Sequence, residues 1–333
     1  NGEFTIALAA ALPAVTDAVI LDGSTQTDNM GNTNADGPEI ELNGSLAGYK
    51  EIGLVINSGA DGCTIRGMVI NRFEKHGILI QSNANTIQGN YIGTDVTGTI
   101  DNGNGKDGMN VVGGGSNIIG GTNSGEGNLL SGNDDDGITL MDNSDDNVVQ
   151  GNRIGTDAAG TSALGNSDEA VVIWNGSDNN LIGGTSPGEA NVIANNGAGV
   201  VLFDNSQQNA VLGNAVYANT LLGIDLSLAI GSDGVTANDT NDSDSGTNGL
   251  LNYPLITAAT ETGGTISIDF DLDVPAGDYR IEFFKNPSGA DPSGYGEGES
   301  FADAVSISHP GGGTQSFSHS FSGAVGDIIT ATA

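Results

Sequence analysis

The chain has 333 residues, of which 37% are hydrophobic, so it holds enough apolar material for buried cores. Acidic residues outnumber basic ones 42 to 8, and the resulting net charge of −34 excludes nucleic acid and anionic membrane surfaces as direct partners. The acids comprise 30 Asp and 12 Glu, and Asp is the acid of turns and calcium loops, so the composition argues against a helical protein.

The first apolar stretch, Phe4 to Ile20, is neither a signal peptide nor a membrane span. Glu3 precedes it, no Lys or Arg does, and Pro13 and Asp17 interrupt it. Cys63 is the only cysteine, which excludes an internal disulfide and a cysteine zinc site. Because the chain begins without Met and stops within an apparent strand, we expect it to be a fragment or a processed product.

Internal repeats dominate the next two hundred residues. The segment NTIQGNYIGTD (85–95) returns 62 residues later as NVVQGNRIGTD (147–157), and NIIGGTNSGEGNLLSGN (117–133) returns 63 residues later as NLIGGTSPGEANVIANN (180–196). Aligned on these segments, the chain shows three short apolar columns in each unit of 22 to 24 residues. Such a unit, with longer loops inserted alternately at two corners, predicts a parallel β-helix with three strands per coil.

The columns also predict which residues of this solenoid stack on one another. The first column contains Leu54, Ile78, Met109, Ile138, Val171, Val200 and Ile224, each followed two residues later by another apolar residue. Because coils repeat at about 4.8 Å, Asn90, Asn152 and Asn214 are expected to form an amide ladder at one corner. Thr5 to Leu12 is expected to cap the first coil.

Several segments resemble one known group of proteins. They are AVILDGSTQ (18–26), PEIELNGSLAG (38–48), CTIRGMVINRF (63–73) and GLLNYPLITAA (249–259), together with the IGTD and GGT repeats. They resemble right-handed parallel β-helix repeat proteins, pectin-lyase-like solenoids found in very large secreted or surface-attached bacterial proteins. The resemblance implies an extracellular location, secreted or at the cell surface. It implies little about activity, since the same solenoid serves polysaccharide lyases, hydrolases, epimerases and non-catalytic stalks.

After Tyr253 and Pro254 the repeats give way to longer alternating strands, among them TISIDFDL (265–272) and YRIEFF (279–284). This pattern predicts a small β-sandwich. The expected architecture is therefore all-β, with a right-handed parallel β-helix and its N-terminal cap over residues 1–249. A β-sandwich over residues 250–333, truncated at its C-terminal end, follows.

Two groups of residues are candidates for catalysis. Lyases acting on uronates need a cation and a base, and hydrolases need facing carboxylates. If the chain is an enzyme, the candidates are Lys75 and His76, at a corner with Arg72 and Glu74, and Asp134 and Asp136 in the acidic run 134–136. Both groups are also what solvated turns of an acidic chain contain. Trp174 is the only tryptophan, so a sugar platform is not indicated, and the sequence leans against an enzyme.

One stripe of the solenoid suggests an interface. Leu79, Val172 and Val201 occupy the outward position of the first column, and an exposed apolar stripe marks a contact unless loops cover it. Contact with another copy or with a neighbouring domain is one alternative, and burial beneath loops is the other.

The junction between the two domains suggests calcium. The segment GSDGVTANDTNDSDSGTNG (231–249) places Asp233, Asp239, Asp242 and Asp244 within a dozen residues with no basic residue to balance them. Calcium takes six to eight oxygen ligands, which Asp, Asn and backbone carbonyls of such a loop supply. A flexible acidic linker is the alternative.

The leading functional interpretation is a non-catalytic structural or adhesive segment of an extracellular or cell-surface bacterial protein. Association of one copy with another is part of this interpretation. An extracellular polysaccharide-binding module is the first alternative, and a pectin-lyase-like lyase or hydrolase is the second. Expected partners are other copies, neighbouring domains of a longer chain, or polysaccharide.

Overall fold

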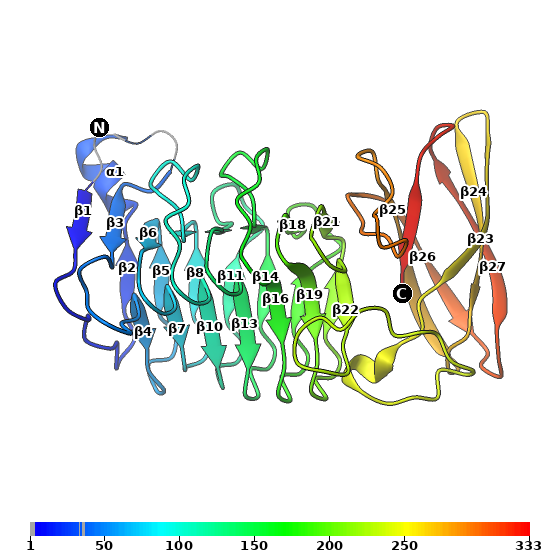
Figure 1. The fold of residues 1–333 in the computed structure, drawn as a ribbon, viewed down its shortest axis with the longest axis horizontal. Helices are drawn as coiled ribbons and strands as arrows, with labels where there is room; N and C mark the ends of the chain where they lie inside the picture. The colour runs from blue at the N-terminus through cyan, green and yellow to red at the C-terminus, as the bar shows by residue number, and fades with distance from the viewer. Residues whose placement is uncertain (1–3, 33, 35–36) are drawn as a thin grey trace.

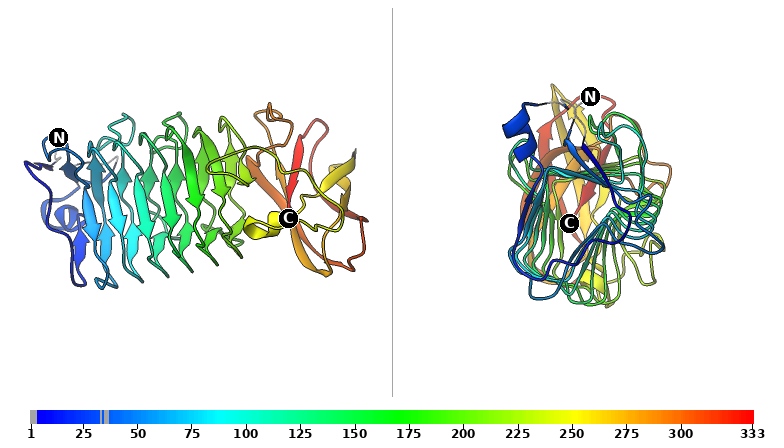
Figure 2. Two further views of the ribbon diagram at one scale, coloured as in Figure 1. Left: turned by 60° about the horizontal axis from the view of Figure 1, so that its bottom comes forward. Right: turned by 90° about the vertical axis from the view of Figure 1, so that its left-hand side faces the viewer.

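The computed structural model describes residues 4–32, 34 and 37–333, and it confirms the predicted all-β architecture. Three parallel sheets wind into a β-helix, and two small antiparallel sheets follow it. Figure 1 shows the coils stacked side by side along the long axis, with the sandwich at one end of the row. The two parts together form an elongated rod (Figure 2). In the part of the chain that the structure describes, no helix is long and apolar enough to cross a membrane.

Each sheet of the β-helix collects one strand from successive coils, and all neighbours pair in parallel. Sheet A contains β1 (Phe4–Ala7), β3 (Ile40–Asn43), β6 (Met68–Asn71), β9 (Tyr91–Ile92), β12 (Leu129–Leu130), β15 (Arg153–Ile154), β18 (Val192–Ala194) and β21 (Ala215–Tyr217). Sheet B contains β4 (Leu54–Ile56), β7 (Ile78–Ile80), β10 (Met109–Val112), β13 (Ile138–Met141), β16 (Glu169–Ile173), β19 (Ala198–Leu202) and β22 (Ile224–Leu226). Sheet C contains β2 (Ile20–Asp22), β5 (Thr64–Arg66), β8 (Thr86–Gln88), β11 (Ile118–Gly120), β14 (Val148–Gln150), β17 (Leu181–Gly183) and β20 (Ala210–Leu212).

The apolar columns of the sequence form the core of the solenoid. On sheet B, Ile78, Met109, Ile138 and Val171 lie opposite one another in register and are fully buried. The other two columns do the same on sheets C and A, and the three rows meet in one continuous core. Because only one or two residues of most strands face this narrow interior, the strands need no more than two to five residues.

Buried asparagines line all three corners, although the sequence predicts a ladder at one. In each asparagine ladder the backbone N–H and side-chain Nδ2 of one residue donate to Oδ1 of its neighbour in the next coil. The predicted residues Asn90, Asn152 and Asn214 belong to one ladder, with Asn128 and Asn191 between them. The other ladders are Asn85, Asn117, Asn147, Asn180, Asn209 and Asn248, and Asn104, Asn133, Asn166, Asn196 and Asn219.

The N-terminal segment supplies strands to the first coil. The expected cap, Thr5 to Leu12, contains most of β1, which pairs in parallel with β3 as the end strand of sheet A. Val15 bridges to Ile56, and β2 ends sheet C. The short helix α1 (Thr25–Met30) follows β2.

The sandwich consists of two three-stranded antiparallel sheets that enclose a second core. One sheet contains β23 (Leu255–Thr262), β24 (Thr265–Leu272) and β27 (Gln315–Ser322), and the other β26 (Ser300–His309), β25 (Gly277–Lys285) and β28 (Ile329–Thr332). Phe270 and Phe283 come from facing sheets and meet edge to face with ring centroids 5.7 Å apart. The 3-10 turn η1 (Thr247–Leu250) lies in the segment that leads to β23.

The loop between β25 and β26 closes the end of the solenoid. Glu297 Oε1 accepts hydrogen bonds from the backbone N–H and Nδ2 of Asn219, as the next asparagine of that ladder would. The adjacent Gly298 carbonyl accepts from the N–H of Val216 on β21, and Glu282 of β25 accepts from the N–H of Gly213. The sandwich therefore continues the hydrogen-bond pattern of the coils, so the junction is a packed contact.

Candidate binding groove and acidic ledge

A groove of about 770 Å³ lies over the outer face of sheet A. Its floor includes Tyr91, Leu129, Arg153 and Val192, which stand opposite one another on β9, β12, β15 and β18. Their chain neighbours, such as Leu130 and Ile154, point into the core, so this row faces outward. The floor thus spans four successive coils, at about 4.8 Å per coil.

Inserted loops form the walls of the groove. The loop 121–128, between β11 and β12, lines one side, and Ala158 in the loop after β15 lines the other. The IGTD sequence fixes the position of these loops against the next coil. Gly155 has a φ of 89°, and a Cβ at this position would lie 2.0 Å from the carbonyl oxygen of Ala194. The two corners at which the sequence places its insertions are therefore the two edges of one groove.

The groove contains charges of both signs, because Arg66, Arg153, Glu39 and Glu126 all line it. Arg153 is exposed and makes no ion pair among the described residues, whereas Arg66 pairs with Asp22. Glu126 also lines the groove, and hydrogen bonds from the side chain and backbone of Asn123 lower the pKa of its carboxyl. Glu126 is therefore held as an ionised acceptor.

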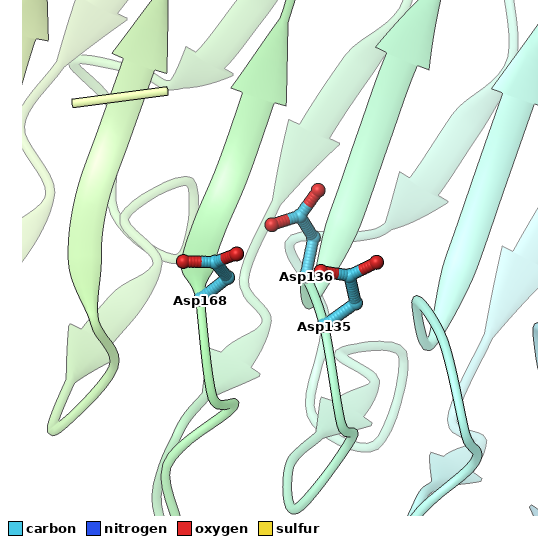
Figure 3. A group of neighbouring side chains, drawn as sticks. All are labelled: Asp135, Asp136 and Asp168. Carbon is cyan, nitrogen blue, oxygen red and sulfur yellow. The ribbon is translucent and has the colours of Figure 1, made fainter. Parts of the chain in front are cut away.

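A second group of polar residues lies outside this groove, where the strands of sheet B begin. We call Asp107, Asp135, Asp136, Asp168 and Glu169 the acidic ledge. The register of β10, β13 and β16 aligns Asp107, Asp136 and Glu169 in one column and Asp135 and Asp168 in the next. Figure 3 shows Asp135, Asp136 and Asp168 projecting from neighbouring strand starts toward one region of space.

Hydrogen bonds hold the ledge in place. Asp136 Oδ2 accepts from the hydroxyl of Thr139 at 2.8 Å, and its Oδ1 accepts from the backbone N–H of Glu169 at 3.1 Å. Glu169 Oε1 accepts from the backbone N–H of Ser232, in the segment after β22, at 3.2 Å. Lys106 Nζ donates to Asp135 Oδ2 at 2.6 Å, which raises the pKa of Lys106.

Burial and mutual repulsion shift the acids of the ledge upward. Burial, followed by the charge of Asp107 and the contact with Glu169, raises the pKa of Asp136 well above its usual range. Partial burial and the charges of Glu169 and Asp135 also raise the pKa of Asp168. A protonated carboxyl beside ionised ones can serve as a general acid, and the same oxygens can hold a hard cation.

The structure brings the predicted catalytic residues to the edge where the strands of sheet B begin, because the register aligns His76 with Asp107 and Lys75 with Lys106. Asp136 belongs to the ledge. His76 lies in the preceding coil, next to Asp107, with its Nδ1 3.2 Å from Asp107 Oδ2. Asp134 is exposed beside the ledge, and Lys75 precedes His76 without an ion pair among the described residues. The ledge acids Asp107, Asp168 and Glu169 were not predicted. The 29- and 33-residue spacings that place Asp107, Asp136 and Glu169 at one repeat position are a signal that could have found them.

The predicted apolar interface is not exposed, and this expectation is wrong. Val172 and Val201 are 4% and 0% exposed, and Leu79 is half-buried. Val172 and Val201 pack with Ala198 and Phe203 in a small outer cluster, over which Trp174 and Phe203 stack with centroids 5.4 Å apart. Aromatic side chains cover Val172 and Val201, so burial, the alternative interpretation, holds for this part of the stripe.

Three of the four residues predicted to bind calcium come together at the junction. Carboxylate oxygens of Asp239, Asp242 and Asp244 lie within 4.8 Å of one another. Burial and the neighbouring acids raise the pKa of Asp242 and of Asp244, and Asp244 Oδ1 is buried without a hydrogen-bond partner. Asp233 stands apart from this cluster, where its Oδ2 accepts from the backbone N–H of Leu228.

Comparisons with known proteins give only distant structural likeness, to solved structures. No family model and no curated protein matches the sequence. Among solved structures, the enzymatically active domain of tailspike protein 2 of bacteriophage CBA120 aligns with 14% identity and a TM-score of 0.38. The match covers 88% of this chain and 53% of that one, so the chain spans about half the length of the tailspike structure. A likeness at this level supports no inference about activity.

Proposed function

We propose that this chain is a rigid, non-catalytic adhesive segment of an extracellular protein, and that a linear polysaccharide lies in the groove over sheet A. The observation that carries this proposal is the groove itself, whose floor spans four coils and which the loop 121–128, Ala158 and the N-terminal segment around Pro38 border. Polar loop residues and the guanidinium of Arg153 supply hydrogen bonds to sugar hydroxyls, and the ring of Tyr91 supplies an aromatic surface. The net charge of −34 disfavours polyanions, so the preferred ligand is a neutral polysaccharide.

A binding role suits the groove better than a catalytic role. None of the ledge acids lines the groove, so the residues with raised carboxyl pKa values do not face a polymer bound there. Of the two glutamates that line it, Glu39 and Glu126, the latter has a lowered pKa and cannot act as a general acid near neutral pH. The capped junction between solenoid and sandwich adds a mechanical role, because it lets the chain present the groove on a stiff rod.

Affinity electrophoresis in gels containing neutral or uronic polysaccharides tests the binding proposal. We expect retardation by a neutral polymer, and Arg153→Ala should weaken it roughly tenfold because a charge-assisted hydrogen bond is lost. Arg72→Ala is the matched control, since Arg72 is an exposed arginine outside the groove lining. Equal binding by both variants would show that the polysaccharide binds outside the groove. Cleavage of the polymer that Asp136→Asn abolishes would overturn the non-catalytic assignment.

We also propose that calcium occupies the junction cluster of Asp239, Asp242 and Asp244. Support comes from their convergent oxygens and from the buried, unpartnered Asp244 Oδ1. The same loop is tied to the sandwich, since Asn252 donates both to the Asp239 carbonyl and to the Asp273 carbonyl. Calcium here would neutralise the acids of a loop whose position is fixed.

Thermal unfolding with calcium or chelator tests the junction site. Calcium should raise the unfolding temperature, and Asp242→Asn should remove most of the increase. Asp233→Asn is the control, because it removes one charge from the same segment outside the cluster. Identical calcium responses in the two variants would contradict the site.

A further inference from the structure

The acidic ledge has more negative charge than its own protein partners balance. Five carboxyl groups meet at the starts of β10, β13 and β16. Two basic side chains contact them, Lys106 through Asp135 and His76 through Asp107. Carboxyl groups stacked at the roughly 4.8 Å coil spacing repel one another, and partial burial strengthens the repulsion. A proton or a cation must therefore be shared among them.

The ledge oxygens have the spacing of a shared ion. Oxygens of Asp135, Asp136 and Asp168 all lie within 4.8 Å of one another. Two oxygens on opposite sides of one Ca²⁺, each about 2.4 Å from it, stand about 4.8 Å apart. Asp168 is exposed, so solvent reaches this group and water can complete the six to eight ligands.

A buried amide beside the ledge gives independent support. Asn110 is only 7% exposed and occupies the outward position of β10, opposite Thr139, whose hydroxyl holds Asp136. Its Nδ2 donates to Asp107 Oδ2 at 2.7 Å, which fixes the amide orientation, because the reversed amide would set two oxygens against each other. Asn110 Oδ1 is buried without a hydrogen-bond partner. The side chain that bonds to Asp107 of the ledge thus has an unused hard oxygen, whose burial is costly unless it meets a donor or a cation.

We propose that the acidic ledge is a calcium site in which Asp135, Asp136 and Asp168 are ligands, with Asn110 and Glu169 in the surrounding polar shell. The site bridges the coils of β13 and β16. It is separate from the junction cluster, which lies in the segment between β22 and β23. Calcium there ties successive coils together through their side chains, in addition to the backbone pairing of the sheet.

Calorimetric titration of the full chain with Ca²⁺, in an Asp239→Asn/Asp244→Asn background that removes the junction cluster, tests this site. We expect residual binding, and we expect Asp168→Asn to weaken it roughly tenfold by deleting a charged ligand. Asp146→Asn is the matched control, because Asp146 is an exposed acid outside the cluster. Lys106→Gln should tighten binding, since it removes the cation that competes for Asp135.

Three results of the titration would contradict the ledge site. No binding at about 10 mM Ca²⁺, above the usual range for extracellular calcium modules, would overturn the proposal. So would equal weakening by Asp168→Asn and Asp146→Asn. Unchanged or weaker binding in Lys106→Gln would place the ion away from Asp135 and contradict the assignment. Loss of the ledge ion alone would leave the groove and its polysaccharide untouched, so the two proposals can fail separately.

Discussion

At the scale of single residues, Asp136 stands out because its environment favours the protonated form. Burial removes it from water, and Asp107 and Glu169 place negative charge beside it. Its hydrogen-bond donors, Thr139 and the N–H of Glu169, do not compensate for this. The folded state therefore holds a proton on this carboxyl at pH values where the unfolded chain, with a pKa near 3.8, has released it.

This difference predicts a pH dependence of stability. A folded-state pKa above the unfolded value gives stabilisation that is fully present at low pH and is lost as pH rises through the folded pKa. Asp136→Asn mimics the protonated side chain and removes that loss. In chelator, we expect the variant to gain stability relative to the wild type between about pH 4 and pH 8, by about 1.4 kcal/mol for each unit of pKa shift. The measurement is denaturant unfolding of both proteins at pH 4 and pH 8. If the free energies of unfolding of the variant and the wild type differ by the same amount at the two pH values, Asp136 does not hold the extra proton.

At the scale of elements, the end of the solenoid depends on a hydrogen-bond acceptor that comes from the sandwich. Glu297 comes from the loop before β26, yet it accepts the two hydrogen bonds that end the third asparagine ladder. Burial raises the pKa of Glu297. Without this acceptor, the N–H and side-chain amide of Asn219, which is only 7% exposed, would be left without the partner that ends the ladder.

Substitution of Glu297 tests this cap. Glu297→Ala should remove the acceptor and speed amide hydrogen exchange of Val216 and Asn219, whereas Glu297→Gln, which keeps Oε1, should remain close to the wild type. The loss of two buried hydrogen bonds should cost about 2–3 kcal/mol in the local opening free energy. If the two variants exchange alike, the cap does not depend on this acceptor.

The repeat pattern predicts the elements well and their outer surroundings poorly. Inward columns such as Ile78 and Met109 follow from spacing alone, because a strand alternates its faces and coils stack in register. Whether Val172 and Val201 are exposed depends on how irregular segments and the Trp174–Phe203 pair fold over the sheet, which repeat spacing does not specify. The ledge was missed in part for a related reason, since its acids come together only when residues 29 and 33 positions apart are aligned as coils.

At the scale of the whole molecule, the fixed junction determines how far the solenoid and sandwich can move relative to each other. Backbone and side-chain hydrogen bonds join the last coil to β25 and to the β25–β26 loop, and η1 adds the contact of Asn248 with Asn209. These contacts come from segments far apart in sequence. A chain joined only by its linker would swing, whereas this one is expected to behave as a single rod (Figure 2).

Spin-label distances measure this rigidity directly. Cys63 is buried and is the only cysteine, so labels can be directed to Ile118→Cys on β11 and Ser318→Cys on β27, both exposed positions on strands. We expect a narrow distance distribution in the wild-type background, since both labels sit on elements of one packed body. Glu297→Ala should broaden the distribution by releasing the cap, and Asp242→Asn should broaden it in calcium but have little effect in chelator. A broad distribution without any substitution would show that the sandwich swings on its linker, and the proposed rod would have to be abandoned.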